Sequence, residues 1–167
     1  MKKFLVISVL FFLIGGCAGF PKTVNVEKRG AINFPSSSVN LVVDRIPGLE
    51  KIITPEVVKR VESLFKEKLA EKKLALEASS SVVIRVIFEK YEDGNISGRA
   101  VSGLILGINV GEPAKIKGHV TISESQKEVT KADVSVESSR SGWNFSYGYG
   151  GAKTLESAFV EETLKLL

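Results

Sequence analysis

The sequence is poor in the side chains that build covalent crosslinks and metal clusters. It contains one Cys and one His among 167 residues. A single Cys excludes an internal disulfide framework and a multi-cysteine zinc site. A single His leaves little room for a His-based metal cluster or a His-dependent catalytic triad. The H-E-x-x-H, G-x-S-x-G and P-loop patterns are also absent. We therefore expect no enzyme, no cofactor and no bound metal.

A strong charge of one sign is lacking as well. The chain has 23 Lys and Arg against 19 Asp and Glu, a net charge of +4. Two of these lysines, Lys2 and Lys3, belong to a segment that we expect to be removed. A nucleic-acid partner requires a concentrated basic face, so we expect none. With 44% hydrophobic and 25% charged residues the chain is typical of a globular protein.

The N-terminus has the three parts of a bacterial export signal. Basic residues 1–3 precede an apolar run at residues 4–14, which is too short for a membrane-spanning helix of about 20 residues. The tetrapeptide Ile-Gly-Gly-Cys at residues 14–17 resembles the lipobox of bacterial lipoproteins. The resemblance implies that residues 1–16 are cleaved off as a signal peptide and that Cys17 is acylated. The alternative is an ordinary secretory signal whose cleavage site precedes a Cys.

Several acyl chains on one residue make a stable membrane anchor, at about 0.8 kcal/mol per buried methylene. Ala18, and not Asp, follows the cysteine. By resemblance to the sorting rule of Gram-negative lipoproteins, we expect the outer membrane of the cell envelope, on its periplasmic face. Residues 17–37 would then be the lipidated cysteine and a tether, with room for a short strand at 24–26. Residues 38–167 would be a single periplasmic domain.

The domain shows strand and helix patterns in a clear order. Thr54 is typical of an N-cap and Pro55 of the first helical position. An apolar stripe runs from Val57 to Leu69, and the charged residues off it, Arg60 among them, are expected to face solvent. Alternating apolar residues predict the strands. The expected elements are strand 39–46, the helix from 55, strands 81–91, 115–123 and 128–138, and a closing helix 153–167.

This order, β-α-β-β-β-α, predicts the α+β class. We expect a two-layer sandwich in which helices cover one face of a mixed four-stranded sheet. The first helix would join two parallel strands by a right-handed crossover. The last two strands would form an antiparallel hairpin around Ser125 and Gln126.

A glycine-rich segment lies between the second and third strands of this scheme. Its glycines form a GxxxGxxxG run, which on a helix lets another backbone approach closely. One interpretation is a helix-packing or oligomerisation zipper, and the other is a glycine-rich connection that rests on the sheet. The three glycines are Gly103, Gly107 and Gly111.

A second unusual segment, residues 139–151, concentrates aromatic side chains on a glycine frame. Such side chains suit contact with proteins, sugars or a lipid interface. The alternative is an edge strand or loop whose rings pack over the core. The aromatic residues are Trp143, Phe145, Tyr147 and Tyr149.

The pattern from residue 88 onward is similar to that of a known family. Residues 88–95 contain the end of a predicted strand and a Gly-Asn pair. Arg99 and the glycine-rich segment come next, and residues 115–122 form the following strand. This resembles an uncharacterised family of bacterial lipoproteins, domain of unknown function 4410, over residues 38–167. The resemblance implies a periplasmic α+β domain without an established activity.

Few polar residues qualify as site candidates. His119 lies on the outward face of its predicted strand, and no carboxylate has a reason visible in the sequence to orient it, so we expect a surface histidine. Asp44, Glu92 and Asp93 are better explained as turn or cap residues than as cation ligands. Asn95 and Arg99 form a polar pair at a strand end, for which a structural turn is the simpler account.

These features lead to one functional prediction with two rivals. We expect a membrane-anchored lipoprotein whose non-catalytic domain binds an envelope protein or assembles with itself. The first rival is a carrier of a small apolar or glycan ligand, which requires a pocket between sheet and helices or under the aromatic segment. The second is an enzyme, which requires a polar cluster around His119 or Arg99 in a cleft.

Overall fold

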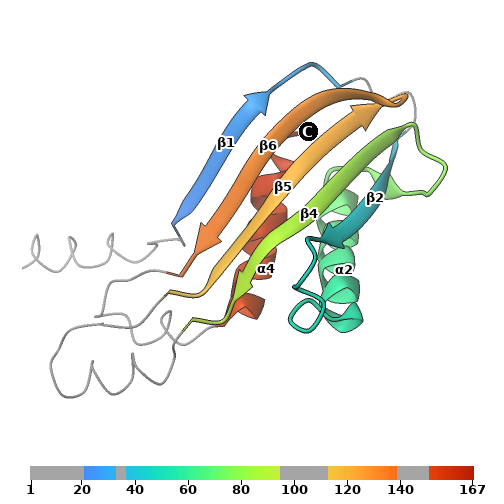
Figure 1. The fold of residues 1–167 in the computed structure, drawn as a ribbon. Helices are drawn as coiled ribbons and strands as arrows, with labels where there is room; N and C mark the ends of the chain where they lie inside the picture. The colour runs from blue at the N-terminus through green and yellow to red at the C-terminus, as the bar shows by residue number, and fades with distance from the viewer. Residues whose placement is uncertain (1–20, 33–36, 95–112, 139–150) are drawn as a thin grey trace, which may run out of the picture.

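The computed structural model describes residues 21–32, 37–94, 113–138 and 151–167. They form a six-stranded mixed sheet and two α-helices that lie on one side of it (Figure 1). The strand order across the sheet is β1-β6-β5-β4-β2-β3. The elements are β1 (Lys22–Lys28), β2 (Ser38–Arg45), α2 (Pro55–Glu71), β3 (Ala75–Leu76), β4 (Val82–Glu92), β5 (Lys115–Glu124), β6 (Lys127–Glu137), the 3₁₀ helix η1 (Ala152–Leu155) and α4 (Glu156–Leu164).

The α+β class is confirmed, and the prediction of four strands is wrong. β2 and β4 are parallel neighbours joined through α2, and β5 and β6 form the antiparallel hairpin. The two extra strands are β1 and β3, which lie at opposite edges of the sheet. Edge strands touch one neighbour only, so they need little apolar alternation, and β3 has just two residues. β1 includes the short strand that the sequence allowed at residues 24–26 of the predicted tether, but it is longer and pairs with β6.

Helix α2 forms as its sequence predicts. Thr54 has an extended backbone before Pro55, although its side chain makes no capping hydrogen bond. The apolar stripe is buried against the sheet, because these residues recur at helical spacing. Its buried members are Val57, Val61, Phe65 and Leu69.

The space between the sheet and the helices is filled by side chains. The fully buried residues include Phe65 of α2, Phe88 of β4 and Phe159 of α4. The ring centroids of Phe88 and Phe159 lie 5.2 Å apart. Gly118 of β5 leaves room for this pair, since a Cβ at that position would lie 2.8 Å from Cζ of Phe159. Close packing of this kind leaves little space for a ligand.

The closing α-helix is shorter than predicted, and two of its acidic residues are buried. Residues 152–155 form a 3₁₀ turn and the α-helix begins at Glu156. Leu155, Ala158, Phe159 and Leu166 are buried. Two acidic residues, Glu156 and Glu162, are buried as well, because α4 packs against both the sheet and α2. In the parts of the chain that the structure describes, no helix is both long enough and apolar enough to cross a membrane.

Candidate functional site

Four strand termini meet at one end of the sheet. There β1 and β5 begin while β4 and β6 end (Figure 1). The amide of Glu137 donates to the carbonyl of Pro21 at 3.0 Å, and the amide of Ser138 donates to the carbonyl of Ala114 at 2.9 Å. We call this region, defined by Pro21, Asp93, Ala114, Ser138 and Ala152, the anchor end.

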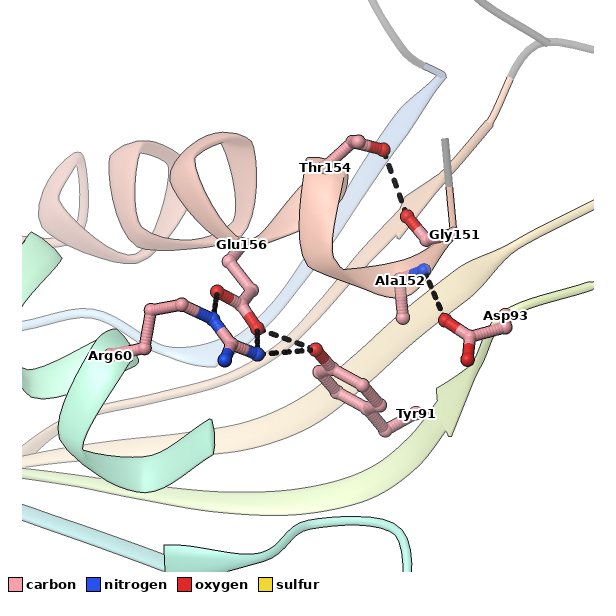
Figure 2. A network of polar contacts seen from close by, with 7 residues as sticks. All are labelled: Arg60, Tyr91, Asp93, Gly151, Ala152, Thr154 and Glu156. Atoms are coloured by element: carbon pink, nitrogen blue, oxygen red, sulfur yellow. Dashed lines mark hydrogen bonds and ion pairs between the residues drawn. The ribbon is translucent and has the colours of Figure 1, made fainter. Parts of the chain in front are cut away.

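Asp93 ties the end of β4 to the start of η1 (Figure 2). Its Oδ1 accepts a hydrogen bond from the amide of Ala152 at 2.8 Å. The Thr154 hydroxyl donates to the carbonyl of Gly151, also at 2.8 Å. Gly151 is required by space, since a Cβ there would lie 2.5 Å from Oδ1 of Asp93. The predicted cap role of Asp93 is thereby confirmed.

This contact gives a testable prediction. Replacing Gly151 by Ala should displace the Asp93 carboxylate, release the Ala152 amide and lower the free energy of unfolding by about 1 kcal/mol, the usual effect of a lost cap. Hydrogen exchange of the Ala152 amide should become faster. Asp93→Ala should have the same effect, whereas Asp93→Asn retains an acceptor and should preserve slow exchange. Unchanged exchange in both of the disruptive variants would contradict the prediction.

A buried ionic cluster connects three elements beside the anchor end (Figure 2). Arg60 of α2 donates from Nε and Nη2 to the two carboxylate oxygens of Glu156 in α4, at 2.7 and 2.6 Å. The hydroxyl of Tyr91 in β4 donates to Oε1 of Glu156 at 2.5 Å. Burial, with the hydrogen bond to Glu156, raises the pKa of Tyr91 well above its usual range. The hydrogen bond to Glu156 likewise raises the pKa of Arg60.

The cluster therefore holds a protonated tyrosine and a guanidinium on one carboxylate. Neither donor releases its proton at neutral pH, so the arrangement suits a structural clamp more than proton transfer. The prediction that Arg60 faces solvent holds in part: its side chain keeps 34% exposure, while its guanidinium contacts Glu156, which is 2% exposed. The sequence carries no local signal for this pair, because α4 holds other acidic residues, Glu161 and Glu162, among its apolar ones.

Ten of the sequence-predicted site residues lie outside the described residues. They are Cys17, Asn95, Arg99, Gly103, Gly107, Gly111, Trp143, Phe145, Tyr147 and Tyr149. The described residues nevertheless establish where their segments join the fold. Residues 1–20 join the fold at Pro21. Residues 95–112 connect the end of β4 to the start of β5, and residues 139–150 connect Ser138 to Gly151. All three segments are thus attached at the anchor end.

His119 has a carboxylate partner, so the expectation of an unoriented surface histidine is wrong. His119 of β5 lies directly opposite Asp133 of β6, and its Nδ1 is 2.8 Å from Oδ1 of Asp133. The hydrogen bond with His119, with the nearby charge of Lys117, holds the pKa of Asp133 below its usual value. The strand register brings His119 and Asp133 together, since directly opposite residues on paired strands have neighbouring side chains on the same face.

A third possible metal ligand lies near this pair. Glu27, His119 and Asp133 each bring one ligand atom within 4.8 Å of the others. Both carboxylates already have ammonium partners. Lys131 Nζ lies 2.5 Å from Glu27, and Lys117 Nζ lies 3.6 Å from Asp133 and 2.6 Å from Glu89. A cation would have to displace these lysines, so the group is best described as an ion-paired surface on the sheet face opposite the helices.

The remaining polar candidates have local roles. Oδ1 of Asp44 accepts from the amide of Arg45 at 2.8 Å, and Glu92 pairs with Lys90 at 3.0 Å. Two open hollows, of about 520 and 680 Å³, lie along α2 and β3 and share the lining residues Lys66, Leu76 and Glu77. Both hollows lie at the β2–β3 edge of the layer between sheet and helices, since residues of α2 line them together with residues of β2 and β3.

Comparison with known proteins identifies the fold and not the family. No protein-family model matches the chain, and no curated protein matches its sequence. Two solved structures have a similar fold, a PelC dodecamer from Paraburkholderia phytofirmans and a dodecamer of a PelC variant from the same organism. The first has 9% identity and a TM-score of 0.57, covering 88% of this chain and 98% of the other. The second has 9% identity and a TM-score of 0.56, covering 87% and 96%. The chain is therefore similar in fold to the PelC subunit over nearly its whole length.

Proposed function

We propose that this protein is a lipid-anchored lipoprotein of the bacterial envelope whose non-catalytic domain assembles with copies of itself at the membrane surface. One observation carries the proposal. The N-terminal segment with its lipobox, the glycine run and the aromatic segment all join the fold at the anchor end. The three segments carry membrane or interaction signatures and are far apart in the sequence, yet the described residues that flank them lie at this one end of the sheet.

The length of chain between lipid and fold supports a membrane-facing anchor end. Pro21 is hydrogen-bonded to β6, and Cys17 precedes it by four residues. An extended chain spans at most about 3.6 Å per residue, so Pro21 would lie within about 15 Å of the acylated cysteine. The strands would then stand with the anchor end toward the bilayer.

Three observations favour assembly over the rival functions. The similar solved structures are dodecamers of PelC by their own description. The space between sheet and helices is filled by fully buried aromatic side chains, which counts against a carrier with an internal ligand pocket. An enzyme would need a cleft around its polar residues. His119 and Asp133 instead lie on the sheet face among ion-paired lysines, and neither of the described pockets includes them.

Photo-crosslinking of the full-length protein in cells tests the proposal. Probes replace Leu104 in the glycine run and Tyr147 in the aromatic segment, and a control probe replaces Arg85, an exposed residue of β4. Mass spectrometry should identify adducts of the first two probes with another copy of the chain, in the membrane fraction. Cys17→Ala should abolish acylation and release the protein from that fraction. If both probes give only monomer, the assembly proposal is wrong.

A further inference from the structure

The sheet is open along both sides. β1 pairs with β6 on one side, and no other described strand covers its outer side. On the opposite side, β3 pairs only with Ser38 and Val39, so residues 40–45 of β2 have no partner strand beyond them among the described residues. We call these the β1 edge and the β2 edge. Open edges present backbone donors and acceptors that readily pair with a strand from another chain.

Both edges carry incompletely buried apolar side chains. On the helix side of the sheet, Val24 and Val26 lie on β1, while Leu41 and Val43 lie on β2. Val24, Leu41 and Val43 pack against the core but are only partly buried. The described part of the chain has three exposed large hydrophobic residues, and all belong to β1 or to the segment directly after β2. They are Val26 at 42%, Ile46 at 40% and Ile52 at 49% exposure.

The directions of the two edge strands determine how copies can pair. β1 begins at the anchor end, whereas β2 is parallel to β4, which finishes there. β1 and β2 therefore run in opposite directions in Figure 1. When the β1 edge of one copy meets the β2 edge of the next, the new pair is antiparallel and both anchor ends remain on the same side.

An antiparallel pair of two β1 strands has the opposite consequence. The two copies would be related by a twofold axis perpendicular to the sheet, and their anchor ends would point in opposite directions. Two lipid anchors so placed could not enter one membrane surface. Of these two antiparallel pairings, only the β1–β2 contact is compatible with a shared membrane.

We infer that neighbouring copies assemble head to tail, with β1 of one copy adding to the β2 edge of the next to form a continuous antiparallel sheet. The inference rests on the proposed lipid anchor and self-assembly. The apolar side chains of the two edges would then extend the hydrophobic core from one copy to the next. A head-to-tail contact closes into a ring when its rotation divides a full turn.

Disulfide crosslinking tests the pairing in the full-length protein in isolated membranes. Asn25→Cys on β1 is combined in turn with Asn40→Cys, Val42→Cys or Asp44→Cys on β2, all on the sheet face opposite the helices. A disulfide requires Cα atoms within about 7 Å, so one partner of the three should match the register. The chain has no cysteine besides the acylated Cys17. Oxidation should yield a ladder of multimers from at least one double variant and only monomer from each single variant.

Asn25→Cys combined with Arg85→Cys is the control, since β4 lies inside the sheet and should give no ladder. Dimers from Asn25→Cys alone would indicate β1–β1 pairing and overturn the inference. A chain that sediments as an oligomer in detergent, with no ladder from any of the three pairs, would overturn it and leave self-assembly intact. A monomeric chain would overturn both proposals.

A charge at the edge provides an independent test. Val26→Lys should reduce the sedimenting species to monomer, because the lysine would be placed in the continuous apolar layer. Thr121→Lys, in the middle strand β5, should leave the oligomer unchanged. Circular dichroism must show that both variants are folded. Retention of the oligomer by a folded Val26→Lys variant would contradict the inferred interface.

Discussion

Replacement of Arg60 by Met is expected to lower the free energy of unfolding by about 3 kcal/mol at pH 7. The Glu156 side chain is 2% exposed, and its carboxylate would lose a bidentate partner and stay buried with only the Tyr91 hydroxyl. Breaking one side of a buried ion pair costs about 3 to 5 kcal/mol. The lower value applies because the Arg60 side chain keeps 34% exposure and is partly solvated. Urea unfolding followed by circular dichroism measures the change.

Two comparisons separate this explanation from a general loss of packing. Arg60→Met combined with Glu156→Met should recover most of the stability, since neither charge is left unpaired. Lys68→Met, which removes an exposed ion pair with Glu71, should have no resolvable effect. Equal losses of stability in Arg60→Met and in the Arg60→Met, Glu156→Met double variant would contradict the structural role of the Arg60–Glu156 ion pair.

Phe159→Ala is expected to cost about 4 kcal/mol. The ring is 1% exposed and lies between Phe88 and the surface of β5 at Gly118. Truncation removes apolar contacts and leaves a cavity, and Phe→Ala changes in cores cost about 3 to 5 kcal/mol. The sheet and α2 are rigid on either side, so little collapse into the cavity is expected. Arg85→Ala, at an exposed position, is the control and should change stability little.

The close contact with Gly118 adds a stricter test. Gly118→Ala places a methyl group 2.8 Å from Cζ of Phe159 and 3.3 Å from the carbonyl oxygen of Ile87, so it should destabilise by about 1 to 3 kcal/mol. Phe159→Leu lacks the atom that clashes. The double variant should therefore be more stable than the sum of the two single changes predicts, by at least about 0.5 kcal/mol. Strict additivity would show that the glycine is not required by this ring.

The parts of the fold that follow from local chemistry were predictable. Thr54 and Pro55 mark the start of α2, and its stripe of buried residues follows helical spacing. The hairpin follows from alternation around Ser125 and Gln126, whose backbones are both left-handed, as this turn requires. The register of the same hairpin could have found the contact of His119 with Asp133, because the two residues lie directly opposite each other on adjacent strands.

The parts that depend on distant pairing were not predictable. The contact of Arg60 with Glu156 joins residues 96 positions apart, and neither residue has a local reason to turn inward. β1 and β3 are edge strands whose composition resembles a connecting segment. Without β1 beside β6, nothing in the sequence places the point where the N-terminal segment joins the fold next to the points where residues 95–112 and 139–150 join it. The common location of these junctions is a product of topology.

The position of β1 also affects the order in which the sheet can form. Its Lys22 lies opposite Val136 of β6, so the first described strand pairs with the last described strand. Closing so long a loop is entropically unfavourable, and contacts of high sequence separation form slowly. The sheet cannot be completed until nearly the whole polypeptide is available. If the chain is exported as proposed, β1 would reach its place only after residues 127–137 had been translocated.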